Sequence, residues 1–308
     1  MSNLPKVSII IPTYNRPDLI RRAVESVLKQ TYQNFEIVII DDTPNDKTEK
    51  VVKNFNDKRI KYIRNQIRKG PSAARNQGIK ESSKDSRYIA FLDDDDEYLP
   101  LFLEKTMRKL EEKEDIIMVA TDAELRSYDE EFIREMHWNF NKEFWKQAIG
   151  NGCVVRRKIF FEENMWYDEN LVLLEDVDIA LRGLKNHKWD FVPEILRIYY
   201  TYPSDKGTTL STLPQTLIND IEYFLRKNYS VYKQAGGKAL GWLHFYIGKW
   251  FCRIGKSKEG RGYLLKAFKF YPRIEVLVYY LLALLFPKTY QNSSLAVLKH
   301  KIFGIFRK

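Results

Sequence analysis

The sequence predicts an α/β domain with a Rossmann-like, mostly parallel sheet flanked by helices, followed by an all-helical region. Short apolar runs alternate with amphipathic helical patterns over the first 120 residues, which is typical of a parallel sheet covered on both faces. From about residue 215 the periodicity is helical throughout. At 308 residues, 44% apolar and 30% charged, the chain is neither disordered nor collagenous.

The elements of the first part follow one another in a regular order. We expect strands, rich in apolar residues, at 7–11, 36–40, 60–64, 88–92 and 116–120. A helix begins at Pro17, a residue favoured at the first helical position, and further helices are expected at 49–55, 71–80 and 100–112. Polar residues follow the strands, at the edge where open α/β sheets bind ligands.

The two predicted domains, 1–214 and 215–308, differ in charge. Residues 226–308 hold 17 Lys and Arg against two acidic residues, a net charge of +15, whereas residues 1–225 carry −5. The apolar run 276–286 is too short to span a bilayer and has basic flanks. We therefore expect a peripheral contact with an anionic membrane surface; a buried helix with a solvated basic face is the alternative. No RNA-binding motif is evident, so nucleic acid is not expected as a partner.

Several kinds of chemistry are excluded. Cys153 and Cys252 are the only cysteines and lie far apart, which excludes a disulfide framework and a zinc–cysteine site and fits a reducing compartment. The four histidines are scattered, and no nucleophile with an adjacent base is visible. The glycine motifs of P-loop and dinucleotide-binding proteins are absent.

Four consecutive aspartates, residues 93–96, follow a predicted buried strand directly. Adjacent carboxylates repel one another, so a fold tolerates them best when a cation neutralises part of the charge. Oxygen ligands suit Mg²⁺ or Mn²⁺. A solvated acidic loop is the alternative.

Two more strand ends carry candidate ligand-binding residues. Asp41 and Asp42 follow the second strand, where a carboxylate can accept hydrogen bonds from a base or a ribose. Either could instead form a local turn or a helix cap. Tyr14, after the first strand, could stack on a base or pack on its own turn. Together these positions predict a nucleoside pocket.

A predicted helix begins near Glu175 and Asp176, with its apolar face formed by residues such as Val177 and Leu181. Free N–H groups at a helix start favour ionised carboxylates, and an ionised carboxylate can take a proton from a hydroxyl. Acid-rich helix starts are also common without catalysis. Asp178 and Arg182 are spaced to form an ion pair.

These segments resemble the family 2 glycosyltransferases, inverting enzymes with the GT-A fold. The resemblance rests on five motifs in the family's order over about 200 residues: VSIIIPTYNR (7–16), IVIIDDTPNDKT (37–48), GPSAARNQGI (70–79), YIAFLDDDD (88–96) and LEDVDIALR (174–182). It implies a nucleotide-sugar donor. Tyr14 and Asp42 favour a UDP-sugar, with a GDP-sugar as the alternative, and the basic, partly apolar tail favours a glycan or lipid-linked acceptor. The expected location is cytoplasmic, at the inner face of the cell membrane.

The resemblance also implies roles for the nucleotide-binding residues. Pro12 and Tyr14 would line the nucleobase pocket, and Asp42 would hydrogen-bond the base. Arg75 resembles the arginine that helps to hold the nucleotide, and Asp94 would lie near the ribose.

For catalysis, the resemblance implies that Asp93 and Asp95 are the ends of the family's DxD motif, with Asp95 the principal ligand of Mn²⁺ or Mg²⁺. Asp176 resembles the general base, with Glu175 as its companion. Many relatives have a histidine where Tyr202 stands here, so its role is unfilled or passes to Lys206. A sugar-nucleotide hydrolase, a nucleotidyltransferase and a non-enzymatic membrane scaffold are the alternatives.

Overall fold

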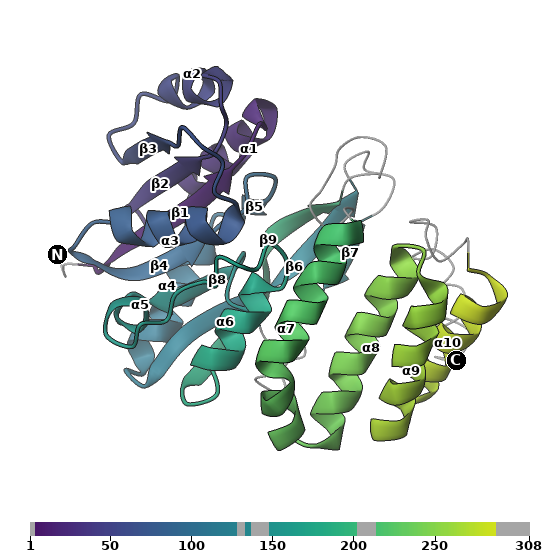
Figure 1. Ribbon diagram of the computed structural model, residues 1–308. Helices are drawn as coiled ribbons and strands as arrows, with labels where there is room; N and C mark the ends of the chain where they lie inside the picture. Colours follow the sequence, from purple (N-terminus) through teal and green to yellow (C-terminus); the bar gives the residue numbers. More distant parts are fainter. Residues whose placement is uncertain (1–3, 128–132, 137–147, 202–213, 288–308) are drawn as a thin grey trace. The chain divides into compact units, whose positions relative to one another are not determined.

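The computed structural model describes residues 4–127, 133–136, 148–201 and 214–287. The chain divides into two compact units, Met1–Tyr202 and Pro203–Lys308. The first is an α/β unit, and the described part of the second is helical (Figure 1).

A mixed sheet forms the centre of the α/β unit. Its strands are β1 (Lys6–Thr13), β2 (Phe35–Asp41), β3 (Ile60–Arg64), β4 (Ser86–Phe91), β5 (Glu97–Tyr98), β6 (Ile116–Ser127), β7 (Ile133–Met136), β8 (Cys153–Arg156) and β9 (Lys188–Thr201). The strand order is β3-β2-β1-β4-β8-β6-β9-β5, and β7 pairs with β6. The predicted α/β class is confirmed.

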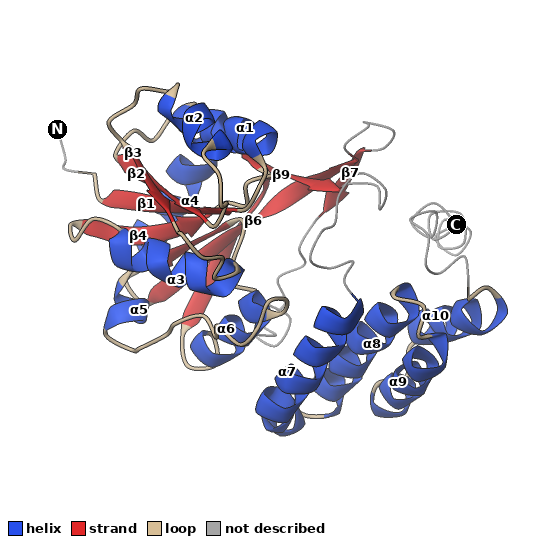
Figure 2. Cartoon of the chain, turned by 45° about the horizontal axis from the view of Figure 1, so that its top comes forward, coloured by secondary structure: helices blue, strands red, loops and turns tan. Residues whose placement is uncertain are grey.

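Helices cover both faces of this sheet (Figure 2). The helices of the unit are α1 (Pro17–Leu28), α2 (Lys47–Lys53), α3 (Pro71–Glu81), α4 (Phe102–Glu112), α5 (Lys158–Phe161) and α6 (Glu175–Gly183). Side chains of α1, α2 and α4 join one apolar core, which includes Ile9, Val24 and Leu103. Side chains of α3, α5 and α6 join a second core with Ile10, Phe91 and Ile179. Neighbouring residues of β1 enter different cores because side chains alternate along a strand.

The sheet contains more antiparallel strand pairs than the sequence pattern predicted. β1 is parallel to β2 and β4, β2 to β3, and β6 to β9. However, β8 is antiparallel to both β4 and β6, and β5 is antiparallel to β9. The sequence analysis did not recognise β8, because four buried residues are too short to show a period.

The second unit contains α7 (Pro214–Gln234), α8 (Gly237–Arg253), α9 (Ser257–Phe270) and α10 (Ile274–Leu285). Helices α8, α9 and α10 share an apolar core that includes Cys252, Leu264 and Tyr279. A Cβ added at Gly260 would lie 2.8 Å from the carbonyl oxygen of Gly248, so α8 and α9 approach closely there. Among the described helices, none combines the length and apolar character needed to cross a bilayer.

Candidate active site

Three parallel strands bring the predicted site residues to one edge of the sheet. In the register of β1, Thr13 lies opposite Asp41 of β2, and Ile10 lies opposite Phe91 of β4. The residues that follow these strands, 14–16, 42–43 and 93–96, therefore leave the sheet at the same edge, where α/β proteins bind ligands.

The central aspartates of the acidic run are held by the first strand and the turn after it. Thr13 Oγ1 donates to Asp94 Oδ2 at 2.6 Å. Arg16 Nη1 donates to Asp94 Oδ1 at 3.1 Å and to Asp95 Oδ2 at 2.8 Å. Burial, and after it the charge of Asp95, raises the pKa of Asp94 to about 7. Burial and the charge of Asp93 also raise the pKa of Asp95, so this edge would bind a further cation favourably.

The fourth aspartate has a different place. Asp96 is buried, accepts the Tyr200 N–H at 2.9 Å and also accepts a hydrogen bond from the Asn151 side-chain amide. Burial, followed by the charges of Asp95 and Asp93, raises its pKa well above the usual range. Asp96 thus ties the acidic run to β9 and to the segment before β8.

Arg75 of α3 connects two acidic motifs that are far apart in the sequence. It donates from Nη1 to Glu175 Oε1 at 2.7 Å and from Nη2 to Asp93 Oδ1 at 2.9 Å. Burial lowers the pKa of Arg75, but the two carboxylates outweigh it and the net shift is upward. Its buried Nε meets no hydrogen-bond partner among the described residues. The structure thus brings Arg75 to the acidic edge, with one donor to spare.

The two carboxylates at the start of α6 differ in their availability. Glu175 is 8% exposed and paired with Arg75, and burial raises its pKa to about 7. Asp176 is half-buried, and its Oδ1 accepts the Val177 N–H at 2.8 Å. Within the described parts of the chain, no side chain donates a hydrogen bond to this carboxylate, and burial raises its pKa. Asp176 is therefore the carboxylate of the pair that can accept a proton from a ligand.

Asp178, in the same first turn of α6, cannot serve in this way. It is fully buried and accepts hydrogen bonds from Arg182 at 2.9 and 3.0 Å. The predicted pair forms, but Asp178 lies in the interior instead of on the surface.

Asp42 organises the loop between β3 and α3. Its Oδ1 accepts the Asn65 amide at 2.8 Å, and its Oδ2 accepts the backbone N–H groups of Lys69 and Gly70 at 2.9 and 2.8 Å. Gly70 has a φ of +90°, which favours glycine. Asp42 therefore has a structural role at the site, and its hydrogen bond to a base stays a prediction.

The same loop carries a residue that the sequence analysis missed. The Arg68 guanidinium lies 4.1 Å from the ring centre of Tyr14, which is 40% exposed. Pro12 is half-buried in β1, two residues earlier. One face of the Tyr14 ring is thus covered by the Arg68 guanidinium. This contact could not be predicted from the sequence, because Arg68 belongs to no recognisable motif.

Tyr199 of β9 is a second missed residue. It is 39% exposed, yet desolvation of the hydroxyl and the charges of Asp96 and Asp93 raise its pKa, with smaller effects from Asp95 and Asp176. Its neighbour Ile198 lies opposite Glu97 and its neighbour Tyr200 donates an N–H to Asp96, so Tyr199 lies beside the acidic run. No sequence pattern distinguishes Tyr199 from the other tyrosines near it in the sequence. Tyr202 and Lys206, considered above in place of a histidine, lie outside the described residues.

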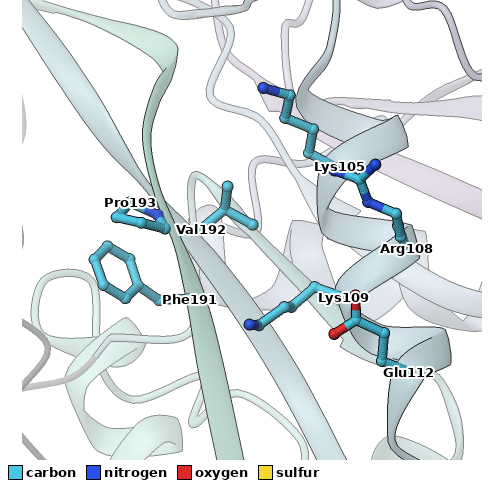
Figure 3. A pocket seen from close by; sticks show the side chains of 7 residues that line it. All are labelled: Lys105, Arg108, Lys109, Glu112, Phe191, Val192 and Pro193. Atoms are coloured by element: carbon cyan, nitrogen blue, oxygen red, sulfur yellow. The ribbon is translucent and has the colours of Figure 1, made fainter.

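A concave surface elsewhere on the α/β unit does not include these residues. It has a volume of about 190 Å³ and lies between α4 and β9, lined by Lys105, Arg108, Lys109, Glu112, Phe191, Val192 and Pro193 (Figure 3). Lys105 pairs with Glu194, and Lys109 lies 3.3 Å from Asp190. Its positive charge is largely compensated.

The acidic edge fits the divalent cation that the family resemblance implies. In the described part of the chain, no group of three or more His, Cys, Asp or Glu side chains is arranged to hold a metal ion. Mg²⁺ commonly takes only one or two carboxylates and completes its shell with water and substrate phosphates. Asp93 and Asp95, whose side chains are 30% and 16% exposed, fit a cation that binds together with a diphosphate.

A family model described as Glycosyl transferase family 2 matches residues 8–166. The chain belongs to glycosyltransferase family 2. The matched segment contains the candidate nucleotide-binding motifs and the acidic run of this glycosyltransferase, whereas Glu175 and Asp176 lie just beyond it.

Relatives of this glycosyltransferase come from several organisms. An uncharacterised glycosyltransferase of Methanocaldococcus jannaschii is 31% identical over 63% of this chain and 70% of that protein. The UDP-Glc:alpha-D-GlcNAc-diphosphoundecaprenol beta-1,3-glucosyltransferase of Escherichia coli is 46% identical over 32% of this chain and 38% of that protein. The crystal structure of S. aureus TarS 1–349 in complex with UDP-GlcNAc shares the fold, with a TM-score of 0.57 and 15% identity over 87% of this chain and 89% of that chain.

Proposed function

We propose that this protein is an inverting glycosyltransferase that moves a sugar from a nucleotide diphosphate to a hydroxyl of a glycan or lipid-linked acceptor. A UDP-sugar is favoured over a GDP-sugar. The name of the Escherichia coli relative, which includes UDP-Glc and a diphosphoundecaprenol acceptor, supports both the UDP-sugar and the lipid-linked acceptor. The UDP-GlcNAc in the TarS complex supports the UDP-sugar.

The half-buried carboxylate of Asp176 carries this proposal. It lies at the start of α6, where no described side chain donates to it, and Glu175 beside it is paired through Arg75 with Asp93. In the proposed reaction, Asp176 takes the proton of the acceptor hydroxyl. The hydroxyl oxygen bonds to the anomeric carbon as the bond from that carbon to the diphosphate oxygen breaks on the opposite face. One displacement inverts the carbon and needs no covalent protein intermediate.

On the nucleotide side, Pro12 and Tyr14 would line the base pocket, with Asp42 near the base and Asp94 near the ribose. Arg75, which pairs with both Glu175 and Asp93, would help to hold the nucleotide. These groups would orient the anomeric carbon toward Asp176.

Asp93 and Asp95 would hold Mg²⁺ or Mn²⁺, which when bound supplies Lewis-acid compensation of the charge that develops on the departing diphosphate. The raised pKa values of Asp94 and Asp95 support this part of the proposal, because a cation would relieve their repulsion.

The test is the variant Asp176→Asn, assayed with UDP- and GDP-sugars and lipid-linked acceptors in Mn²⁺. We expect transfer to fall by about 10² to 10⁴-fold and nucleotide binding by calorimetry to be nearly unchanged. Asp85→Asn, the same change at an exposed position, should keep full activity. Retained transfer in Asp176→Asn would refute the assignment of the base, and release of free sugar without acceptor would indicate a hydrolase. Asp95→Ala should weaken nucleotide binding only when Mn²⁺ is present.

A further inference from the structure

Helix α10 is apolar on two opposite sides. Val276, Tyr279 and Ala283 face the core that it shares with α8 and α9. The outward side, termed here the α10 leucine face, consists of Ile274, Leu277, Leu281, Leu284 and Leu285, which are 39 to 70% exposed.

The spacing of the α10 leucine face follows the helical repeat. Residues 274, 277, 281 and 284 are separated by three and four positions, so they form one stripe along the helix. With 12 residues, α10 is about 18 Å long, too short to span a bilayer. On α9, against which α10 packs, Leu265 and Phe268 are also exposed, at 53% and 39%. A soluble protein rarely leaves a contiguous apolar surface of this kind without a partner.

The charge of the unit determines which partner fits. In the described part of the unit, residues 214–287, there are twelve Lys and Arg and four acidic residues, Asp220, Glu222, Glu259 and Glu275. Lys266, Lys269 and Arg273 are exposed beside the apolar residues of α9 and at the start of α10. A second copy of this unit would bring equal positive charge against it. The segment 288–308 contains five Lys and Arg and no acidic residue, so it would also add like charge.

We propose that the α10 leucine face, with Leu265 and Phe268, binds the surface of an anionic lipid bilayer. The leucines enter the boundary between headgroups and acyl chains, while Lys269 in the last turn of α9 and Arg273 at the start of α10 contact lipid phosphates. This association does not depend on the proposed transfer reaction, and it would hold the chain at a surface that carries lipid-linked molecules.

Vesicle flotation of the full chain tests this proposal without any activity assay. We expect the protein to float with vesicles of phosphatidylcholine containing about one third phosphatidylglycerol, and much less with phosphatidylcholine alone. In about 0.5 M NaCl the bound fraction should fall but persist, because apolar insertion is not screened. Binding that disappears completely in salt would refute the insertion.

Two double variants test whether flotation depends on the leucines of the α10 leucine face or on exposed leucines in general. Leu277→Ser with Leu281→Ser should reduce the bound fraction at least tenfold, with an unchanged circular dichroism spectrum. The matched control, Leu4→Ser with Leu101→Ser, replaces leucines that are 50% and 38% exposed in the α/β unit and should float as the unchanged protein does. Equal flotation of both double variants would overturn the proposal.

The other occupants of this face give different results. If a second copy covers it, light scattering will find a dimer that Leu277→Ser with Leu281→Ser dissociates, and the unchanged protein will not float. If segment 288–308 covers it, the unchanged protein will not float, and the same variant will lower the melting temperature of a monomer. Either result would overturn lipid binding.

Discussion

Replacing Arg75 by methionine will destabilise the α/β unit, because two carboxylates depend on its charge. Arg75 and Glu175 have side chains only 7% and 10% exposed, and their atoms lie 2.7 Å apart. Removing one partner of a buried ion pair costs about 3–5 kcal/mol. Asp93 is 30% exposed, and water will solvate it after the change. We therefore expect a loss of about 3–4 kcal/mol in the free energy of unfolding near pH 8.

The loss will be smaller at lower pH. Burial already raises the pKa of Glu175 to about 7 although Arg75 opposes the shift, so in Arg75→Met this pKa will rise further. When the pKa of a carboxyl group is higher in the folded than in the unfolded state, the folded protein holds its proton more tightly. The free energy of unfolding therefore falls as the pH rises through the folded-state pKa. The variant should consequently lose stability between pH 5 and pH 8 more steeply than the unchanged protein.

The measurement is hydrogen exchange of peptides from β1 and β2 in increasing urea, which reports on the α/β unit alone. A double-mutant cycle that combines Arg75→Met with Glu175→Gln should give a coupling energy of about 1–3 kcal/mol. Arg87→Met, at an arginine whose side chain is 58% exposed, should change stability by less than about 0.5 kcal/mol. A loss below about 1 kcal/mol at both pH values, or no coupling to Glu175, would show that this pair is not desolvated and refute the reasoning.

Three further predictions concern packing and the substrate side. Gly78→Ala should lower the melting temperature by several degrees, because the new Cβ would lie 2.4 Å from Cγ2 of the fully buried Ile10, an overpacking cost of about 1–3 kcal/mol. In contrast, Gly262→Ala in α9 meets nothing within 4 Å and should stabilise by up to about 1 kcal/mol. Tyr199→Ala should reduce kcat/KM for transfer at least about tenfold with little change in thermal unfolding, and normal transfer would exclude Tyr199 from the site.

Within the α/β unit, the local sequence pattern predicted which segments form strands better than it predicted which strands pair with one another. The apolar runs predicted β1, β2, β3 and β4, and parallel pairing placed their carboxyl ends together, as observed. The antiparallel insertion of β8 escaped prediction because its four residues carry no period.

The sequence by itself determined the family, the α/β class and the contrast between a mildly acidic body and a basic tail, because motifs, periodicity and charge are all local properties of the chain. Only the tertiary structure decided that Arg75 joins Asp93 to Glu175 and that Asp176 is more accessible than Asp178. It also decided that α10 exposes a second apolar side. Burial and pairing depend on residues brought together from distant parts of the chain, so they follow from the fold and not from neighbours in sequence.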